Sequence, residues 1–291
     1  MPEKARVIRR RISSVTNTAK ITRTMEMVAT SKLKRAQARV VSSGPYLDTL
    51  KEIMGRLAGA AADVSRYPLL AAREVKKVLL WIVTADRGLC GSYNVNLLRL
   101  GREIIDREKA AGHEVSVWMS GRKGVVAFRF REIPMVRTLI GMTDRPTFAD
   151  ARKMAKELTD PFLAGEVDRV LIVWPRFLTL GRQPPSEMQL VPIAPPEEAG
   201  EKKHDEVPFL YEPSPEEIFK ELLPLYVENM VFRVLAESVV GEMIARRTAM
   251  KLATDNAEKL VKALTLQYNK ARQSQITMEL ADILGGSEAL K

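Results

Sequence analysis

The residue types best suited to covalent chemistry are sparse in this chain, which holds one cysteine and two histidines. A thiol becomes a nucleophile when a neighbouring cation or histidine lowers its pKa. Arg87 lies close to Cys90, but His113 and His204 are both distant from it in sequence. We therefore interpret Cys90 as a packed thiol. So few His and Cys side chains also argue against a zinc site, and a single Cys excludes an internal disulfide.

The best candidate for a nucleotide-binding turn is Thr84–Ser92, TADRGLCGS, which contains glycines and follows a strand-like run. The turn lacks the G-x-G-x-x-G spacing that lets a backbone approach a pyrophosphate. No G-x-x-x-x-G-K-[ST] loop, H-E-x-x-H motif or G-x-S-x-G elbow occurs in the chain. We therefore expect no catalytic residue, no cofactor and no metal site in this chain.

Two long segments with few or no helix breakers lie at the two ends of the sequence. Residues 3–43 contain neither Pro nor Gly, and residues 225–291 contain no Pro and only three Gly. Both segments are therefore expected to form long helices. In each, a coiled-coil seam with alternating spacings of four and three is expected. The first seam is Ile8, Ile12, Val15, Ala19, Thr22, Glu26, Ala29, Leu33, Ala36 and Val40. The second seam is Ala236, Val239, Met243, Arg246, Met250, Ala253, Ala257, Leu260, Leu264, Gln267, Ala271, Ser274, Met278 and Ala281.

One part of the first helix is apolar on nearly every side. Ile21, Met25, Met27 and Val28 fall off the seam, so residues 21–29 present apolar side chains all round. A helix of this kind is usually enclosed, because it would otherwise expose a large apolar patch. The pattern predicts that this part of the helix runs through a sleeve.

Between the two helices the pattern changes to strand-like runs that alternate with amphipathic helices. The expected strands are 75–85, 114–119, 167–174 and 188–193, and the expected helices are 94–110, 122–131 and 148–163, with Thr147 as an N-cap. This alternation predicts a mostly parallel, doubly wound sheet. A charged loop at 195–206 and a linker from Pro208 to Pro224 should follow. The expected fold class is α/β plus coiled coil, with an antiparallel pair of terminal helices around the sheet.

The formal net charge of +10 is concentrated at the start of the chain. Residues 1–50 hold eleven Lys and Arg against three acidic residues. A basic helix suits a solvated face, a nucleic acid or an acidic protein partner. Residues 1–45 contain no Phe, Tyr or Trp that could stack on bases. Two function classes remain: a shaft or scaffold in a larger assembly, and a basic coiled-coil nucleic-acid-binding protein.

Motifs spread over the whole chain carry a family resemblance. They lie at Arg10–Ile12, Ile21–Ala29, Ser31–Lys32, Asp86–Gly91, Glu237–Ser238, Ala249–Lys251, Ala253–Asn256, Asn269–Gln273 and Ile276–Ser287. Together they resemble the gamma-subunit family of F-type ATP synthases. The resemblance implies a Rossmann-like α/β domain inserted into the coiled coil, with 1–58, 75–207 and 212–291 as the three domains.

The family resemblance also implies a function. The chain would be the central rotor stalk of the F1 sector of a proton-translocating ATP synthase, coupling c-ring rotation to conformational changes of the α3β3 hexamer. The implied partners are the α and β subunits, the ε subunit and the c-ring of the Fo sector, without nucleic acid and without insertion into the membrane. The chain would be non-catalytic, and peripheral on the cytoplasmic face of a bacterial plasma membrane.

Two sets of contact residues are implied by the same resemblance. Contacts to the catalytic subunits would be made by Arg272, Gln273, Arg246 and Met25. An apolar collar and a bearing at the far tip would be made by Ile21, Met27, Val28, Ile276, Leu280, Ile283 and Leu284.

Overall fold

The computed structural model describes residues 2–60, 67–142, 146–194, 212 and 214–288. Within them lie the helices α1 (Pro2–Ala60), α2 (Tyr93–Ala110), α3 (Arg122–Phe130), α4 (Phe148–Leu163) and α5 (Pro215–Glu288). The strands are β1 (Lys77–Val83), β2 (Glu114–Ser120), β3 (Arg137–Leu139), β4 (Arg169–Pro175) and β5 (Pro185–Val191). The chain divides into a helix-pair unit, residues 1–30 with 246–291, and a body unit, residues 31–245.

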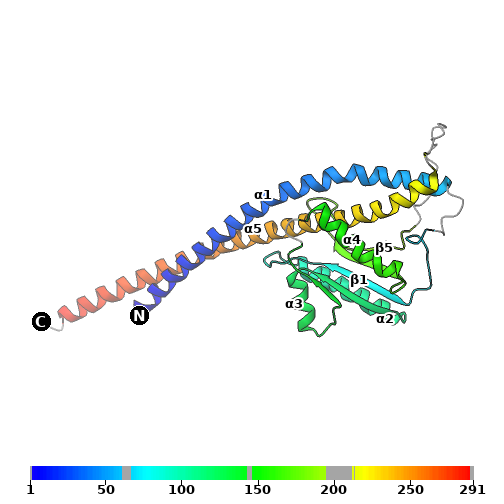
Figure 1. Cartoon of the computed structure of the whole chain (residues 1–291). Coiled ribbons are helices and arrows are strands. Elements are labelled where there is room, and N and C mark those ends of the chain that lie inside the picture. Colours follow the sequence, from blue (N-terminus) through cyan, green and yellow to red (C-terminus); the bar gives the residue numbers. More distant parts are fainter. Residues whose placement is uncertain (1, 61–66, 143–145, 195–211, 213, 289–291) are drawn as a thin grey trace. The chain divides into compact units, whose positions relative to one another are not determined.

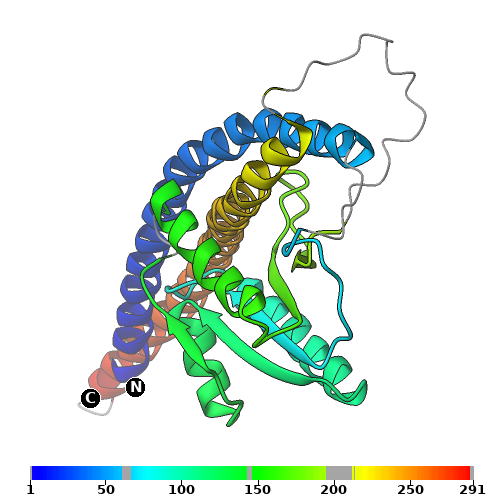
Figure 2. The same ribbon diagram turned by 45° about the vertical axis from the view of Figure 1, so that its right-hand side comes forward.

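In the helix-pair unit the first part of α1 and the last part of α5 run side by side. The start of α1 and the end of α5 lie at the same end of this pair in both views (Figures 1 and 2), so the helices are antiparallel, as expected. The hydroxyls of Thr22 and Thr254 meet at 2.7 Å in the buried contact between them. Arg23 on the exposed side donates to Glu258 at 2.8 Å.

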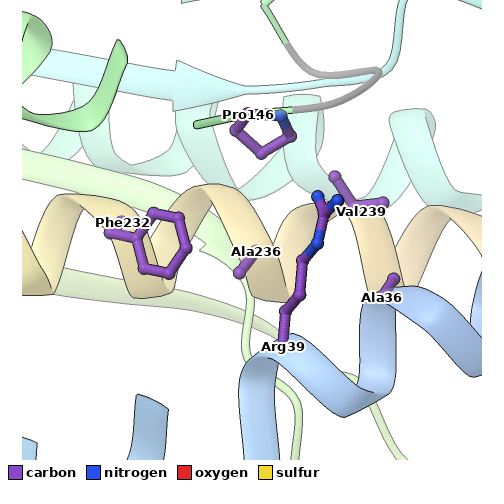
Figure 3. Close-up of a pocket in the computed structure, with 6 residues that line it drawn as sticks. All are labelled: Ala36, Arg39, Pro146, Phe232, Ala236 and Val239. Atoms are coloured by element: carbon purple, nitrogen blue, oxygen red, sulfur yellow. The ribbon is translucent and has the colours of Figure 1, made fainter. Parts of the chain in front are cut away.

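The seam expected on α1 is confirmed. Its members in the helix-pair unit are all buried or half-buried: Ile8, Ile12, Val15, Ala19, Thr22, Glu26 and Ala29. The seam continues in the body unit, where Leu33 and Ala36 pack with Val240 and Met243 of α5. Figure 3 shows Ala36 on the side of α1 that faces α5, near Val239.

The seam expected on α5 is partly wrong. Met250, Ala257 and Leu264 are buried and Ala271 is half-buried as expected, but the expected seam residues Leu260, Gln267 and Ser274 are exposed. Val261, Tyr268 and Gln275 are half-buried in their place. Each lies four residues after Ala257, Leu264 or Ala271, whereas the expected seam residue lies three residues after. Met278 and Ala281 are exposed as well.

The body unit is built on a five-stranded sheet in the order β3-β2-β1-β4-β5. β1 pairs in parallel with both β2 and β4, β2 pairs in parallel with β3, and only β5 runs antiparallel, against β4. The expected doubly wound, mostly parallel sheet is thereby confirmed. Six of the seven residues of β1 are buried, because helices cover both faces of the sheet.

Alternate residues of each central strand point to opposite faces of the sheet. Val78, Leu80 and Ile82 of β1 pack with α2 and α3 on one face. Leu79, Trp81 and Val83 pack on the other face with α4 and with the body-unit parts of α1 and α5. Figure 1 shows α2 and α3 on the side of the sheet opposite α4. The body unit therefore holds two apolar layers that fix these parts of α1 and α5 to the sheet.

Helix α4 matches its expected bounds, and Thr147 caps it. The Thr147 hydroxyl accepts a hydrogen bond from the backbone N–H of Asp150, whose carboxylate in turn accepts from the backbone N–H of Thr147. This reciprocal capping box satisfies two backbone donors at the helix start.

Two further expectations about the elements are wrong. The Pro208–Pro224 linker is already helical from Pro215, and α5 runs through Pro224. Phe219, Leu223 and Val227 are buried around this proline, and their burial offsets the lost hydrogen bond. β3 was not expected, and β5 begins three residues earlier than expected. The domain boundary at 207 lies outside the described residues, and the proposed three-part division stays a prediction.

Candidate interaction surface of the paired helices

The collar residues of α1 lie on the outside of the helix pair. Ile21, Met27 and Val28 are between 51% and 61% exposed, whereas Met25 is half-buried. The seam explains this arrangement: Thr22, Glu26 and Ala29 turn toward α5, so the apolar positions between them must face outward. The sequence pattern placed three of these four side chains correctly on an outward face.

α5 adds apolar side chains to the outer surface of the same unit. Leu252, Leu260 and Leu266 are about half exposed or more. Single exposed leucines are common, but several large ones on a narrow two-helix unit indicate a surface that binds another protein. The sequence pattern places Leu260 on the seam, which is wrong. Leu252 and Leu266 are large apolar residues off the expected seam, and this position indicates that they are exposed.

The tip of α5 is a second apolar surface. Ile276, Leu280, Ile283 and Leu284 are between 47% and 68% exposed. Because Thr22 lies against Thr254 in an antiparallel pair, the start of α1 lies about level with residue 274. Figure 1 shows the red end of α5 continuing beyond the blue start of α1. Among the residues of the helix-pair unit that the structure describes, no part of α1 covers this tip.

The proposed contact residues Arg272 and Gln273 are both exposed, immediately after the half-buried seam residue Ala271. Arg246 differs, because only 8% of it is exposed. Its seam position was correctly predicted, but a buried guanidinium presents little surface to a partner. The structure therefore separates Arg246 from the exposed pair Arg272 and Gln273, and its contact role stays a prediction.

The turn after β1 is held by the chain's own polar atoms. Asp86 Oδ1 accepts from the backbone N–H of Arg122 at 3.0 Å, and the Thr84 hydroxyl accepts from the backbone N–H of Gly124 at 3.1 Å. These two donors are at the N-terminus of α3, the kind of position where other proteins bind phosphate. Oxygen atoms of the chain itself already occupy it.

Cys90, in the same turn, is buried, and its sulfur accepts from the Asn94 amide at 3.2 Å. The interpretation as a packed thiol is confirmed. Among the residues that the structure describes, no group of three or more His, Cys, Asp or Glu could hold a metal ion. Over the same described ranges, no helix combines the length and apolar character needed to span a membrane.

A small hollow in the body unit lies between α1 and α5. Figure 3 shows it lined by Ala36 and Arg39 of α1, by Phe232, Ala236 and Val239 of α5, and by Pro146. Its interior volume of about 10 Å³ is close to the minimum that one water molecule needs. The hollow is therefore too small for a nucleotide.

Comparison with known proteins assigns the family. A family model described as ATP synthase matches residues 4–290. The ATP synthase gamma chain of Gemmatimonas aurantiaca is 44% identical, over 99% of both chains. That of Syntrophobacter fumaroxidans is 42% identical, over 98% of both. The chain belongs to the ATP synthase gamma-chain family. Membership in the gamma-chain family decides between the two function classes left open above, in favour of the shaft.

Solved structures support the fold. A chain of the Euglena gracilis mitochondrial ATP synthase, solved by cryo-electron microscopy in rotational state 3, aligns with a TM-score of 0.67 at 20% identity, covering 100% of this chain and 95% of that one. A chain of the rotor of the same enzyme, in rotational state 1, aligns with a TM-score of 0.63 at 19% identity, covering 95% and 100%. At such identities the likeness shows the shared fold, a coiled coil with an inserted Rossmann-like domain.

Proposed function

We propose that this gamma chain is the central rotor stalk of the F1 sector of a proton-translocating ATP synthase. It couples rotation of the c-ring to conformational changes of the catalytic α3β3 hexamer. The observation that carries the proposal is the exposed apolar surface of the helix-pair unit, on a chain of the gamma family. An apolar contact has no preferred direction, so it can hold a shaft in a sleeve while the shaft turns.

Symmetry explains how such a shaft could control catalysis. Two antiparallel helices of unlike sequence have no threefold axis, so they present a different face to each of three surrounding catalytic subunits. Different contacts stabilise different conformations, and therefore different nucleotide affinities, in the three subunits. Rotation then passes each subunit through the three states in turn.

The chain itself is proposed to be non-catalytic. Support comes from the N-terminus of α3, where Asp86 and Thr84 fill the position that a phosphate would need. The nucleotide sites would then belong to the α and β subunits. Mechanical coupling would be the only contribution of the gamma chain to turnover.

The remaining partners are the ε subunit and the c-ring of the Fo sector. We place the chain on the cytoplasmic face of a bacterial plasma membrane, as a peripheral subunit, because the relatives named above come from bacteria. Purification of the complex from its source membrane tests these partners. Recovery of the chain without ε and c subunits would contradict the assignment.

Arg272 and Gln273 are proposed to contact the catalytic subunits, and a double substitution tests this role. In the assembled complex, Arg272→Ala with Gln273→Ala should lower ATP hydrolysis and synthesis while helicity and assembly stay normal. Lys262→Ala, at another exposed position of α5, is the matched control. Activity equal to that of the control would remove both residues from the contact surface.

A further inference from the structure

A buried carboxylate joins α5 to the sheet within the body unit. The side chain of Glu237 is only 1% exposed. Its Oε2 accepts from the indole N–H of Trp174, at the end of β4, at 2.8 Å and from the backbone N–H of Phe177 at 3.2 Å. Its Oε1 accepts from Arg233, one turn earlier on α5, at 2.8 Å. Two of the three donors therefore come from β4 and the residues after it.

Neighbouring positions on α5 tighten the same junction. The hydroxyl of Tyr93, the first residue of α2, donates to the backbone carbonyl of Ser238 at 3.1 Å. A Cβ added to Gly241 would lie 3.0 Å from Pro175 Cγ, so a larger residue there would crowd the ring of Pro175. We call the group Glu237, Ser238 and Gly241, with its partners Trp174, Pro175, Phe177 and Tyr93, the α5 clamp.

The α5 clamp joins α5 to the sheet through buried polar atoms. Elsewhere in the body unit α5 packs through apolar side chains such as Phe219, Val227 and Val231, and its contacts from Arg152 to Glu228 and from Tyr67 to the Glu216 carbonyl are exposed. Apolar burial is non-directional, and packed helices can slide by small amounts. A hydrogen bond has a required geometry, and a shift of α5 would take the buried carboxylate away from its donors Trp174 and Phe177, which is costly. The clamp therefore fixes the position of α5 along and around its axis.

The path of the polypeptide makes this contact mechanically important. Going along the chain, the strands of the sheet are joined to α5 only ahead of Pro215, which is about six helical turns before Glu237. A force applied to the sheet therefore has two routes to the later part of α5. The route through side-chain contacts is shorter than the route along the backbone. Directional contacts between sheet and helix must then carry the shear part of that force.

We propose that Glu237 is a positioning residue through which torque passes between the sheet and α5. The proposal rests on the proposed rotor function. It assigns the transfer of force to one buried acceptor and its donors Trp174 and Phe177. Arg233 lies on α5 itself, so its bond to Glu237 orients the carboxylate without crossing from helix to sheet.

Three substitutions in the complete complex, reconstituted into vesicles, test the proposal. Glu237→Leu keeps a similar volume but removes every acceptor. Glu237→Gln keeps one carbonyl oxygen that can accept from Trp174 and Phe177. Arg233→Gln is the matched control, because it removes only the donor on α5. The readout is protons pumped per ATP hydrolysed, measured against an opposing proton gradient.

We expect Glu237→Leu to lower this ratio several-fold while ATP hydrolysis continues, and Glu237→Gln and Arg233→Gln to keep it near the wild-type value. Rescue by the Gln variant separates positioning from general damage to the fold. A Glu237→Leu complex that pumps as many protons per ATP as the wild type would overturn the proposal.

Should Glu237→Leu fail to assemble, Trp174→Phe removes the indole donor together with one ring and should cause a smaller fall of the same ratio under load. An unchanged ratio in that variant would also contradict the clamp. The two proposals fail in different ways. A wild-type complex that hydrolyses ATP without pumping protons would count against the rotor function. A wild-type complex that pumps protons, with Glu237 variants that pump as many per ATP, would count against the role of Glu237 alone.

Discussion

Glu108 on α2 pairs with three basic side chains of the body unit. His113 lies 2.8 Å from its carboxylate, Arg107 donates at 2.9 Å, and Arg169 of β4 also pairs with it. Burial acts to raise the pKa of Glu108, but the hydrogen bonds from His113 and Arg107 and the nearby arginine charges outweigh it. The pKa therefore lies below its ordinary value.

A lowered carboxyl pKa makes stability depend on pH in a defined direction. The stabilisation by Glu108 is fully present above the pKa of the unfolded chain, and it is lost as the pH falls through the lower pKa of the folded state. Glu108→Gln should lower the free energy of unfolding by about 1–3 kcal/mol at neutral pH. The variant should then lose less further stability than the wild type below pH ~4. Urea unfolding over a pH series measures both effects. Glu103→Gln, at an exposed position of α2, is the control, and an equal acid response in both variants would contradict the account.

Two glycines in long helices should respond in opposite directions. Gly241→Val would push a side chain against Pro175 and Tyr93, and should cost about 1–3 kcal/mol. A Cβ at Gly44 meets nothing within 4 Å, so Gly44→Ala should stabilise α1 by about 0.5–1 kcal/mol. Thermal unfolding of the two variants checks the prediction. A stabilising Gly241→Val would be inconsistent with the close approach of α5 to Pro175.

For individual residues, the sequence predicts which side chains are exposed better than which side chains they contact. The outward positions of Ile21, Met27 and Val28 followed from the seam alone. The bond between Glu237 and Trp174 could not be predicted, because the two residues come from separate elements and meet only through the topology of the sheet. Local patterns carry no information about such contacts.

Among the elements, α5 shows where periodicity is ambiguous. Leu260 and Val261 are both apolar, so residue type cannot decide which of them faces α1. The choice depends on the partner helix, where Thr22 meets Thr254 and so selects the positions four residues after Met250, Ala257 and Leu264. A seam in one helix is fixed only by its counterpart in the other.

The prolines in the long helices also show that local sequence does not decide the structure alone. Pro45 and Pro224 lie inside α1 and α5, although proline normally ends or kinks a helix. Both are followed by buried residues, Leu47 and Leu50 in α1 and Val227 in α5, whose packing holds the chain helical. Local propensity predicted a linker up to Pro224, and tertiary packing overrode it.

The Thr22 and Thr254 pair predicts a measurable coupling between the two helices. Each hydroxyl also lies within hydrogen-bond distance of a carbonyl of its own helix, 3.1 Å from Ala19 for Thr22 and 2.9 Å from Met250 for Thr254. Because each hydroxyl has one proton, one threonine donates to the other while the second donates to its own helix. Either Thr→Val change should cost about 1 kcal/mol, and the double variant should cost less than the sum, because both polar groups are then removed together. A double-mutant cycle by thermal unfolding measures the difference. Thr24→Val, at an exposed position, controls for the loss of a hydroxyl, and strict additivity would argue against direct contact.

At the scale of the whole molecule, the uncovered tip should act in assembly more than in folding. Removing residues 276–291 deletes Ile276, Leu280, Ile283 and Leu284 but leaves the part of α5 that lies beside α1. We expect the helix content per residue to be unchanged, and assembly with α3β3 to weaken by degrees. Circular dichroism and co-purification with the α and β subunits measure the two. Collapse of the remaining helix pair would show that the tip is needed for the fold itself.

Rotation of the chain inside the α3β3 hexamer can be observed in a single-molecule experiment. The α3β3 hexamer is fixed to a surface, and a bead is attached to the exposed face of α3 in the body unit through a cysteine at Arg122, with Cys90 buried and left in place. On adding ATP, the account predicts rotation in one direction, with pauses about a third of a turn apart that reflect the threefold hexamer. Sustained ATP hydrolysis by assembled complexes whose beads stay still would contradict it.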